Sequence, residues 1–261
     1  MTIFKHELRQ GRTAFAVWTA GVGAMLAACL ILFPEMKGEM EQVGQMFGSM
    51  GAFTAAFGMD KLDFGTLVGY YAIECGNVLG LGGAFYAAIT GAGILSREEK
   101  NRTAEFLLPH PVTRRQVLTQ KLLSVLARIA AFNLLITALA LGCMAVIGEP
   151  VPWTEFLLLH GGYFLLQLEL ACLCFGISAF LVRGSLGAGL GLALGMYCLN
   201  LVSNIAEPAE FLRYVTPFAY CEGADIVSEL SLDPILLALG LLYSAAALAA
   251  GYRHYCKKDI Q

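Results

Sequence analysis

The residues that could do chemistry in this chain gather in one polar run, Ser96–Lys121, which lies between two long apolar segments. The run reads SREEKNRTAEFLLPHPVTRRQVLTQK and carries an acidic pair, Glu98 and Glu99, near its start. Charged residues flank its centre, where Phe106–Pro109 form a short apolar stretch without carboxylates. Charges at the rim of an interface supply orientation more than affinity. The run therefore favours a segment that docks into a groove on another protein.

A second group of polar residues lies inside the apolar segments themselves. Glu74 and Asn77 fall in the second long segment, and Glu169 falls near the middle of the fourth. An ionised side chain at the centre of a bilayer costs roughly 2.5–3.5 kcal/mol on insertion scales. Glu74, Asn77 and Glu169 are therefore candidates to line a translocation path, with interhelical hydrogen bonding as the equal alternative for Glu169. His160, near the outer end of the fourth segment, is expected at the membrane interface.

The acidic pair also raises the possibility of a hydrolase. Glu98, Glu99 and Arg102 resemble the paired glutamates and arginine of CAAX-protease-like membrane peptidases. The spacing is one residue short of the pattern E-E-x-x-x-R, and His160 is the one histidine inside an expected span. A carboxylate pair needs an oriented water or a metal ion to hydrolyse a bond. An intramembrane peptidase is thus the alternative function, and the sequence lacks the histidines that would complete its site.

Nucleotide and metal chemistry are not expected on this chain. The phosphate-binding motif G-x-x-x-x-G-K-[ST] does not occur in the sequence, so energy from ATP would have to come from a partner. Eight cysteines are present, most of them in apolar runs, where cysteine behaves as a small hydrophobic residue. Cys172 and Cys174 are two residues apart on an expected helix, so their thiols point to different faces. Neither a cofactor, a metal site nor a disulfide framework is expected.

The elements that hold these residues are expected to be transmembrane helices. Of the 261 residues, 57% are hydrophobic and 14% are charged, against about 25% charged in soluble domains. A helix needs about 20 apolar residues to cross a bilayer. The apolar runs are long and continuous, unlike the short alternating strands of a barrel. The predicted fold class is therefore all-α integral membrane.

The apolar runs predict six transmembrane helices in a single permease domain, residues 1–261. The expected spans are about Phe15–Phe33, Phe64–Leu95, Leu122–Ile147, Phe156–Val182, Ser185–Ile205 and Pro234–Tyr252. Residues 1–14 are typical of an amphipathic interfacial helix, and Pro34 with the glutamates after it is expected to end the first span. Residues 206–233 form an external segment, part of which is expected to be re-entrant. The glycine series in the fifth span allows close helix packing.

The basic residues predict an orientation. The proposed inner segments, counted together with Arg128 near the inner end of the third span, hold 14 of the 17 basic residues, since only Lys37, Lys61 and Arg213 fall in the outer segments. Cytoplasmic loops carry an excess of lysine and arginine. Both termini and the run 96–121 are therefore expected in the cytoplasm, with the protein in the inner or plasma membrane.

The polar run resembles the loop of ABC-2 type exporter permeases, which reads E-x-x-x-x-T-x-E-x-L-L-x-x-P-V-S/T-R. The residues that carry the resemblance are Glu98, Glu99, Arg102, Thr103, Ala104, Glu105, Phe106, Leu107, Leu108, Pro109, His110, Pro111, Val112, Thr113 and Arg114. The late stretch Leu212–Tyr220, LRYVTPFAY, is similar to that family's segment before the last helix. The order of amphipathic start, six spans and basic tail extends the resemblance over the whole chain.

The resemblance implies a role for the run. In that family the loop joins transmembrane helices 2 and 3 and forms a coupling helix that sits on the ATPase subunit. Here Arg102–Leu108 contains no helix breaker, and Pro109 is expected to stop the helix. Phe106 and Leu107 are then the residues that enter the groove on the partner. Arg102 and Glu105 are expected to form ion pairs at its rim.

The resemblance also implies partners. It predicts two copies of a cytoplasmic ABC ATPase, which bind ATP and magnesium, and a second permease chain that makes a homodimer in the lipid bilayer. No nucleic acid is expected as a partner. The cargo would be a peptide, an antibiotic or another amphiphile. A further alternative is a non-transporting immunity or sensor protein, which would still function when the partner ATPase is inactive.

Overall fold

The computed structural model describes residues 2–48, 51–59, 61–100, 113–181 and 185–257. Within these residues the chain is helical and contains no strand. Six helical stretches are long and apolar enough to cross a membrane. The predicted all-α integral membrane fold with six spans is therefore confirmed.

The six spans are built from eight helical segments that follow the predicted apolar runs. These are α1 (Thr2–Gly48), α3 (Leu67–Cys75), the π-helix η1 (Gly76–Leu81), α4 (Gly82–Lys100), α6 (Arg114–Ile147), α7 (Trp153–Ser178), α8 (Ser185–Ile205) and α10 (Pro234–Lys257). The segments α3, η1 and α4 join end to end as the second span. The bounds of α8 are those that the sequence predicts, whereas α6 begins at Arg114, well ahead of the predicted start at Leu122.

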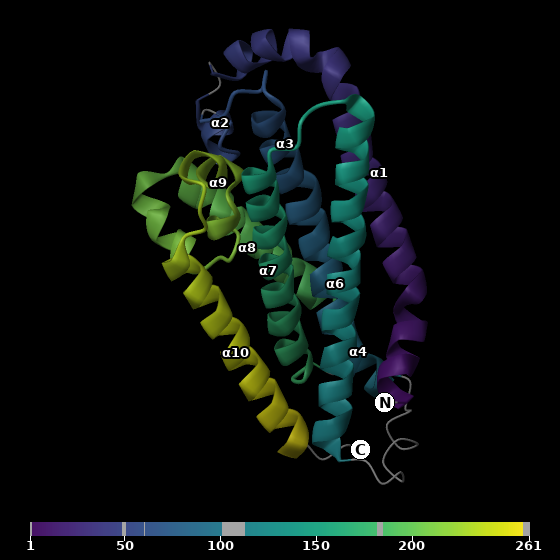
Figure 1. Cartoon of the computed structure of the whole chain (residues 1–261). Coiled ribbons are helices and arrows are strands. Elements are labelled where there is room, and N and C mark those ends of the chain that lie inside the picture. Colours follow the sequence, from purple (N-terminus) through teal and green to yellow (C-terminus); the bar gives the residue numbers. More distant parts are fainter. Residues whose placement is uncertain (1, 49–50, 60, 101–112, 182–184, 258–261) are drawn as a thin grey trace.

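The helices pack around α7, which lies in the middle of the bundle. Helix α4 packs along one side of α7 and also contacts α8, while α10 packs along another side (Figure 1). Helix α1 lies beside α6 at the opposite edge from α10 (Figure 1). We call the end of the bundle where α4 ends and α6 begins the base. The first turn of α1 and the last turn of α10 lie at this same end (Figure 1).

Helix α1 corrects two expectations about the start of the chain. Residues 2–14 form the first turns of α1 and not a separate interfacial helix, and Pro34 lies inside the helix instead of ending it. Residues 2–14 are held against α6 as part of α1. For example, the Phe4 N–H on α1 donates a hydrogen bond to Gln120 Oε1 on α6 at 3.3 Å. Membrane helices tolerate proline where the freed backbone groups are satisfied locally. Beyond the bundle, the final turns of α1 lie across its end (Figure 1).

The second span departs from a regular α-helix at η1, which has the sequence GNVLGL. Glycines on this span let α7 approach its backbone. A Cβ atom at Gly80 would lie 3.0 Å from the Tyr163 ring, and one at Gly91 would collide with the carbonyl oxygen of Ala171. Helix packing in membranes relies on such small residues. The wide turn of η1 and the close contact at Gly91 together fix how α4 lies on α7.

Short helices form the end of the bundle opposite the base, which we call the crown. They are α2 (Ala52–Ala56), the 3₁₀ helices η2 (Glu207–Tyr214) and η3 (Ala219–Cys221), and α9 (Gly223–Glu229). The stretch from Phe218 to Cys221 is buried against the bundle, and α9 packs on α3 and α7. The predicted external segment 206–233 therefore folds onto the ends of the spanning helices. Its expected entry into the membrane stays a prediction.

Candidate functional site

The predicted coupling segment is described only at its two ends. Glu98 and Glu99 lie in the last turn of α4, where the backbone alone is described. The predicted coupling residues Arg102, Thr103, Glu105, Phe106, Leu107, Leu108 and Pro109 lie outside the described residues. Their roles in docking therefore stay predictions.

The chain resumes at Thr113, whose side chain starts α6 with a capping box. Thr113 Oγ1 accepts a hydrogen bond from the Gln116 N–H at 3.3 Å, and the Thr113 N–H donates to Gln116 Oε1 at 3.0 Å. This arrangement satisfies backbone donors that a helix start leaves open. Arg114 Nη1 donates to the carbonyl oxygen of Tyr255 in the last turns of α10 at 3.4 Å. The end of the coupling segment is thus tied to two helices of the base.

A buried ion pair joins three helices at the base. Lys121 on α6 is fully buried, and its Nζ lies 2.7 Å from Oε1 of Glu7 on α1. The same ammonium donates to the carbonyl oxygen of Ile94 on α4 at 3.0 Å. A buried pair of this kind holds its geometry because separation leaves an uncompensated charge in an apolar site. The base therefore couples α1 to α4 and α6, the two helices that flank the predicted coupling segment.

The translocation candidates Glu74 and Glu169 occupy different surroundings. Glu74, on α3, is half-buried and accepts a hydrogen bond from the Cys29 thiol of α1 at 3.4 Å. Glu169 is buried in the contact between α7 and α10, where its carboxylate lies against Gly240. Tyr220 lies near this carboxylate, yet neither oxygen meets hydrogen-bonding geometry with a described group. The geometry places Glu169 in helix packing, and its part in a path stays a prediction.

His160 is buried inside the bundle, and its expected place at the depth of the membrane interface stays a prediction. Its Nε2 lies 2.6 Å from the Tyr71 hydroxyl, and its Nδ1 lies 2.9 Å from Thr137 Oγ1. Both ring nitrogens are therefore used in contacts between three helices. The paired glutamates of the peptidase alternative lie at the base, whereas His160 lies in the part of α7 nearer the crown. Among the described residues the two sets do not form one site.

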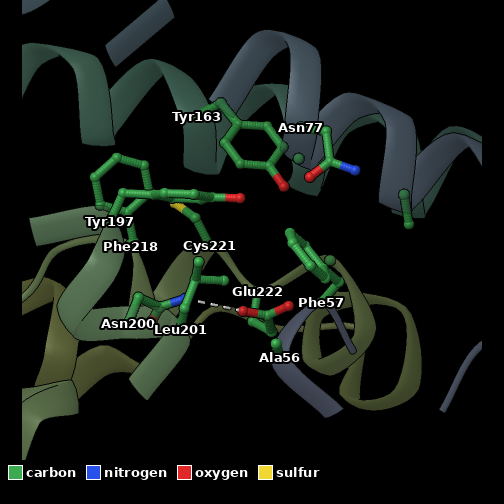
Figure 2. A pocket seen from close by; sticks show the side chains of 13 residues that line it. Ala56, Phe57, Asn77, Tyr163, Tyr197, Asn200, Leu201, Phe218, Cys221 and Glu222 are labelled. Atoms are coloured by element: carbon green, nitrogen blue, oxygen red, sulfur yellow. Dashed lines mark hydrogen bonds between the residues drawn. The ribbon is translucent and has the colours of Figure 1, made fainter. Parts of the chain in front are cut away.

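Asn77, the third candidate, lines a small polar cavity under the crown. The cavity has a volume of about 50 Å³, which is room for about three water molecules. Figure 2 shows Tyr163 and Tyr197 on one side and Phe57 and Glu222 on the other. The spanning helices thus supply aromatic rings and an amide, and the crown supplies a carboxylate.

Glu222 is held by two asparagines of α8. Its Oε2 accepts hydrogen bonds from Asn200 Nδ2 at 3.1 Å and from Asn204 Nδ2 at 3.0 Å. Asn204 Nδ2 also donates to the carbonyl oxygen of Ala56 at 3.2 Å, which ties α2 to the same cluster. Burial raises the pKa of the Glu222 carboxyl above its ordinary value, and the two amide hydrogen bonds offset part of that rise. The nearby ammonium of Lys61 forms an ion pair with Asp225 at 2.9 Å.

Asn77 also lies on a second, larger hollow. A groove of about 470 Å³ runs between α1 and the second span, with Trp18 and Met25 on one wall and Leu81 and Phe85 on the other. Apart from Asn77, its described lining is apolar or glycine, and it includes no charged residue. Both walls belong to spanning helices, so the groove lies at the depth of the lipid chains. Asn77, on η1, is the residue that the groove shares with the polar cavity.

The sequence did not reveal two of these clusters. Lys121, Ser124 and Arg128 recur at helical spacing, and the shared face of α6 that they form is a signal of burial against a neighbour. The cluster around Glu222 brings together α2, α8 and the crown, which are far apart in the chain. Sequence spacing carries no information about such a contact.

Six apolar helices that pack into one bundle define a multi-pass helical membrane protein. The sequence profile of the ABC-2 family transporter proteins matches residues 1–260. The chain therefore belongs to the ABC-2 family of transporter proteins, as the resemblance of its polar run predicts. A comparison with curated proteins finds no match.

Family membership defines the role of the chain in coarse terms. It is a membrane permease of the ABC exporter class, a transport component that is not itself catalytic. Membership also implies an ABC ATPase as partner. The prediction of a multi-pass membrane protein is confirmed by the six apolar helices together with the family match.

Proposed function

We propose that this permease forms the translocation path of an ATP-driven exporter and receives its mechanical input at the base. The observation that carries the proposal is the Glu7–Lys121 contact with the Ile94 carbonyl, because it ties the helices on both sides of the coupling segment to α1. A force applied between α4 and α6 therefore acts on three spans together. Arg114 extends this connection to α10.

The partner at the base would be a cytoplasmic ABC ATPase, present in two copies and carrying ATP and magnesium. The termini would then lie in the cytoplasm, at the end that holds most basic residues. The crown would face the outside, and cargo would leave near it. Phe106 and Leu107 would enter the groove on the ATPase, with Arg102 and Glu105 at the rim.

A test of coupling replaces Phe106 and Leu107 by aspartate in the permease assembled with its ATPase. We expect the variant to insert normally and to lose the stimulation of ATP hydrolysis by the permease, because charge disrupts an apolar contact. Phe211→Asp is the matched control, since Phe211 is exposed in the crown at the opposite end. Normal stimulation by the double variant would remove the coupling role.

The second permease chain would pack on the open face of α8. Gly187, Gly191 and Gly195 lie on this face at helical spacing, with open space where a Cβ would stand, and Cys198 continues the row. Small residues let two helices approach closely in lipid. Residues that lie close to the twofold axis of such a dimer face their own copies. With the axis at this glycine face, the two copies of Cys198 should form a disulfide-linked dimer on mild oxidation. Cys198→Ser should abolish the disulfide-linked dimer. A disulfide-linked dimer that persists in this variant must use another cysteine and would move the interface elsewhere.

A further inference from the structure

The groove and the polar cavity share the lining residue Asn77, which lies on the π-helical turn η1. Single π-helical turns inside α-helices occur frequently at functional sites. From Asn77 the groove follows the second span towards Phe85 and follows α1 along Trp18 and Gly21. The polar cavity lies on the side of Asn77 where the crown covers the bundle (Figure 2). An extended apolar hollow and a small polar one thus lie on either side of one residue, Asn77.

The groove has the dimensions and chemistry of a site for an apolar chain. Its volume of about 470 Å³ lies within the usual range of ligand sites, roughly 300–1,000 Å³. Apart from the neighbouring residues of α1 itself, no atom of the described residues lies within 4 Å of the position that a Cβ at Gly21 would take, so the groove is open at that point. Because both walls are spanning helices, the occupant must partition into the hydrocarbon of the bilayer.

The cavity has the chemistry of a site for a cationic group. Among the described lining residues of the cavity, Glu222 alone carries a formal charge. Aromatic rings of Tyr163, Tyr197, Phe218 and Phe57 make up much of the remaining lining (Figure 2). A carboxylate combined with aromatic faces is the arrangement that recognises ammonium groups. Asn200 adds a buried Oδ1 without a hydrogen-bond partner in the described part of the chain.

We propose that the groove and the cavity form one binding site for a cationic amphiphile. The ammonium group lies at Glu222 among the aromatic rings, and the apolar chain lies along the groove past Trp18. Asn77 lies at the junction of head group and chain. The inference deepens the proposed export function by naming its substrate class, and it rests on that function.

Charge selects among amphiphiles at this site. An anionic head group would be placed beside the Glu222 carboxylate without a cation among the described lining residues to balance it. A neutral head group would gain no ion pair. The shared chemistry, an ammonium on an apolar chain, belongs both to free alkylamines and to aminophospholipids.

The test uses Trp18 as the reporter, since the chain contains two tryptophans. Trp153→Phe removes the other one, which is exposed on α7. The purified permease is placed in bilayers of phosphatidylglycerol and titrated with dodecylammonium that carries bromine near its chain end. We expect saturable quenching of Trp18 fluorescence, with binding at least roughly tenfold tighter than that of equally brominated dodecanol or dodecanoate.

Two variants test the two halves of the site. Glu222→Gln keeps an acceptor for Asn200 and Asn204 and should raise the Kd for dodecylammonium roughly tenfold while leaving that for dodecanol unchanged. Glu229→Gln, an exposed position at the end of α9, the short helix that follows Glu222, should change neither Kd. Gly21→Leu should fill the groove and abolish quenching by every probe. Gly142→Leu, on an open face of α6, is its control.

The outcomes separate this site from the coupling function, because the titration contains no ATPase. Equal binding of the three probes, or an unchanged dodecylammonium Kd in Glu222→Gln, would overturn the proposal even if the permease stimulates its ATPase. Specific binding of dodecylammonium supports the proposal even if the permease does not stimulate its ATPase. Adding phosphatidylethanolamine to the bilayer then identifies the source: competition assigns the ammonium to a lipid head group, and its absence assigns it to a free amphiphile.

Discussion

The base and the crown of the bundle use charge in opposite ways. At the base, Lys121 is fully buried and is satisfied by Glu7 and the Ile94 carbonyl. At the crown, Glu222 is held by two neutral amides beside a cavity, and the neighbouring pair of Lys61 and Asp225 is largely exposed. A closed ion pair fixes helices together, whereas a carboxylate that, among the described residues, is held by neutral amides leaves room for a cationic ligand. The base is therefore the rigid end of the bundle, and the crown is the end at which we propose binding.

The largest effect should follow from breaking the base. Lys121→Met leaves Glu7 buried without a counterion, and removing one partner of a buried pair costs about 3–5 kcal/mol. We expect a large fall in the thermal unfolding midpoint of the purified permease. The double variant with Glu7→Gln removes the stranded charge and should recover part of the loss. A single variant as stable as the parent protein would show that the base is not held by charge.

The next effect compares two glycines of the second span. Gly91→Ala forces a Cβ against the Ala171 carbonyl, so α4 and α7 must separate, with an expected cost of about 1–3 kcal/mol. Gly76→Ala places its Cβ 3.0 Å from the Tyr163 hydroxyl, which borders the cavity and has space to move. The second variant should therefore lose much less stability in the same thermal assay. Equal losses of stability in the two variants would contradict the difference between a rigid base and a more adaptable region beside the crown.

A smaller effect should appear on changing pH. Burial raises the pKa of Glu222, with Asp225 adding to the rise and Lys61 with the two amides opposing it. The unfolded chain ionises at its ordinary pKa near 4.3, so stability should fall as pH rises towards the raised pKa. Dodecylammonium binding should strengthen over the same window, because it needs the ionised carboxylate. Glu222→Gln should flatten both profiles, and two unchanged profiles would assign the titration to another group.

The smallest effect should come from the exposed ion pair of the crown. The Lys61 side chain is 54% exposed, and pairs of this kind contribute about 0–1 kcal/mol. Lys61→Met should therefore shift the unfolding midpoint little, in contrast to Lys121→Met. A fall in the unfolding midpoint as large as that of Lys121→Met would show that ion pairs also stabilise the crown.

The sequence predicted the spans because apolar length is a local property. Ser185–Ile205 shows this well, since both bounds of α8 follow from the apolar run alone. The expected break of the first helix at Pro34 is wrong, because a membrane helix tolerates a proline whose freed backbone groups are satisfied locally. The π-helical turn at Gly76–Leu81 has no periodic signal in the sequence, and its glycines Gly76 and Gly80 lie against Tyr163 of α7, which is distant in the chain.

The candidate site was predictable only where one residue carried the signal. Asn77 and Glu169 were found because polar residues in apolar runs are rare. The structure separates them, with Asn77 on a cavity and Glu169 in a helix contact. Glu222 was missed because external acidic residues are ordinary, and only the contacts with Asn200 and Asn204 make it unusual.

The unbroken course of α1 has a consequence for the timing of transport. An α-helix rises about 1.5 Å per residue, so the stretch from Glu7 to Pro34 is a stiff rod of about 40 Å. One end of this rod is clamped by Lys121, and its other end continues over the far side of the molecule. A tilt of α1 imposed by the ATPase would move both ends of the helix at the same time. Closure of the ATPase and release of the cargo would then occur together.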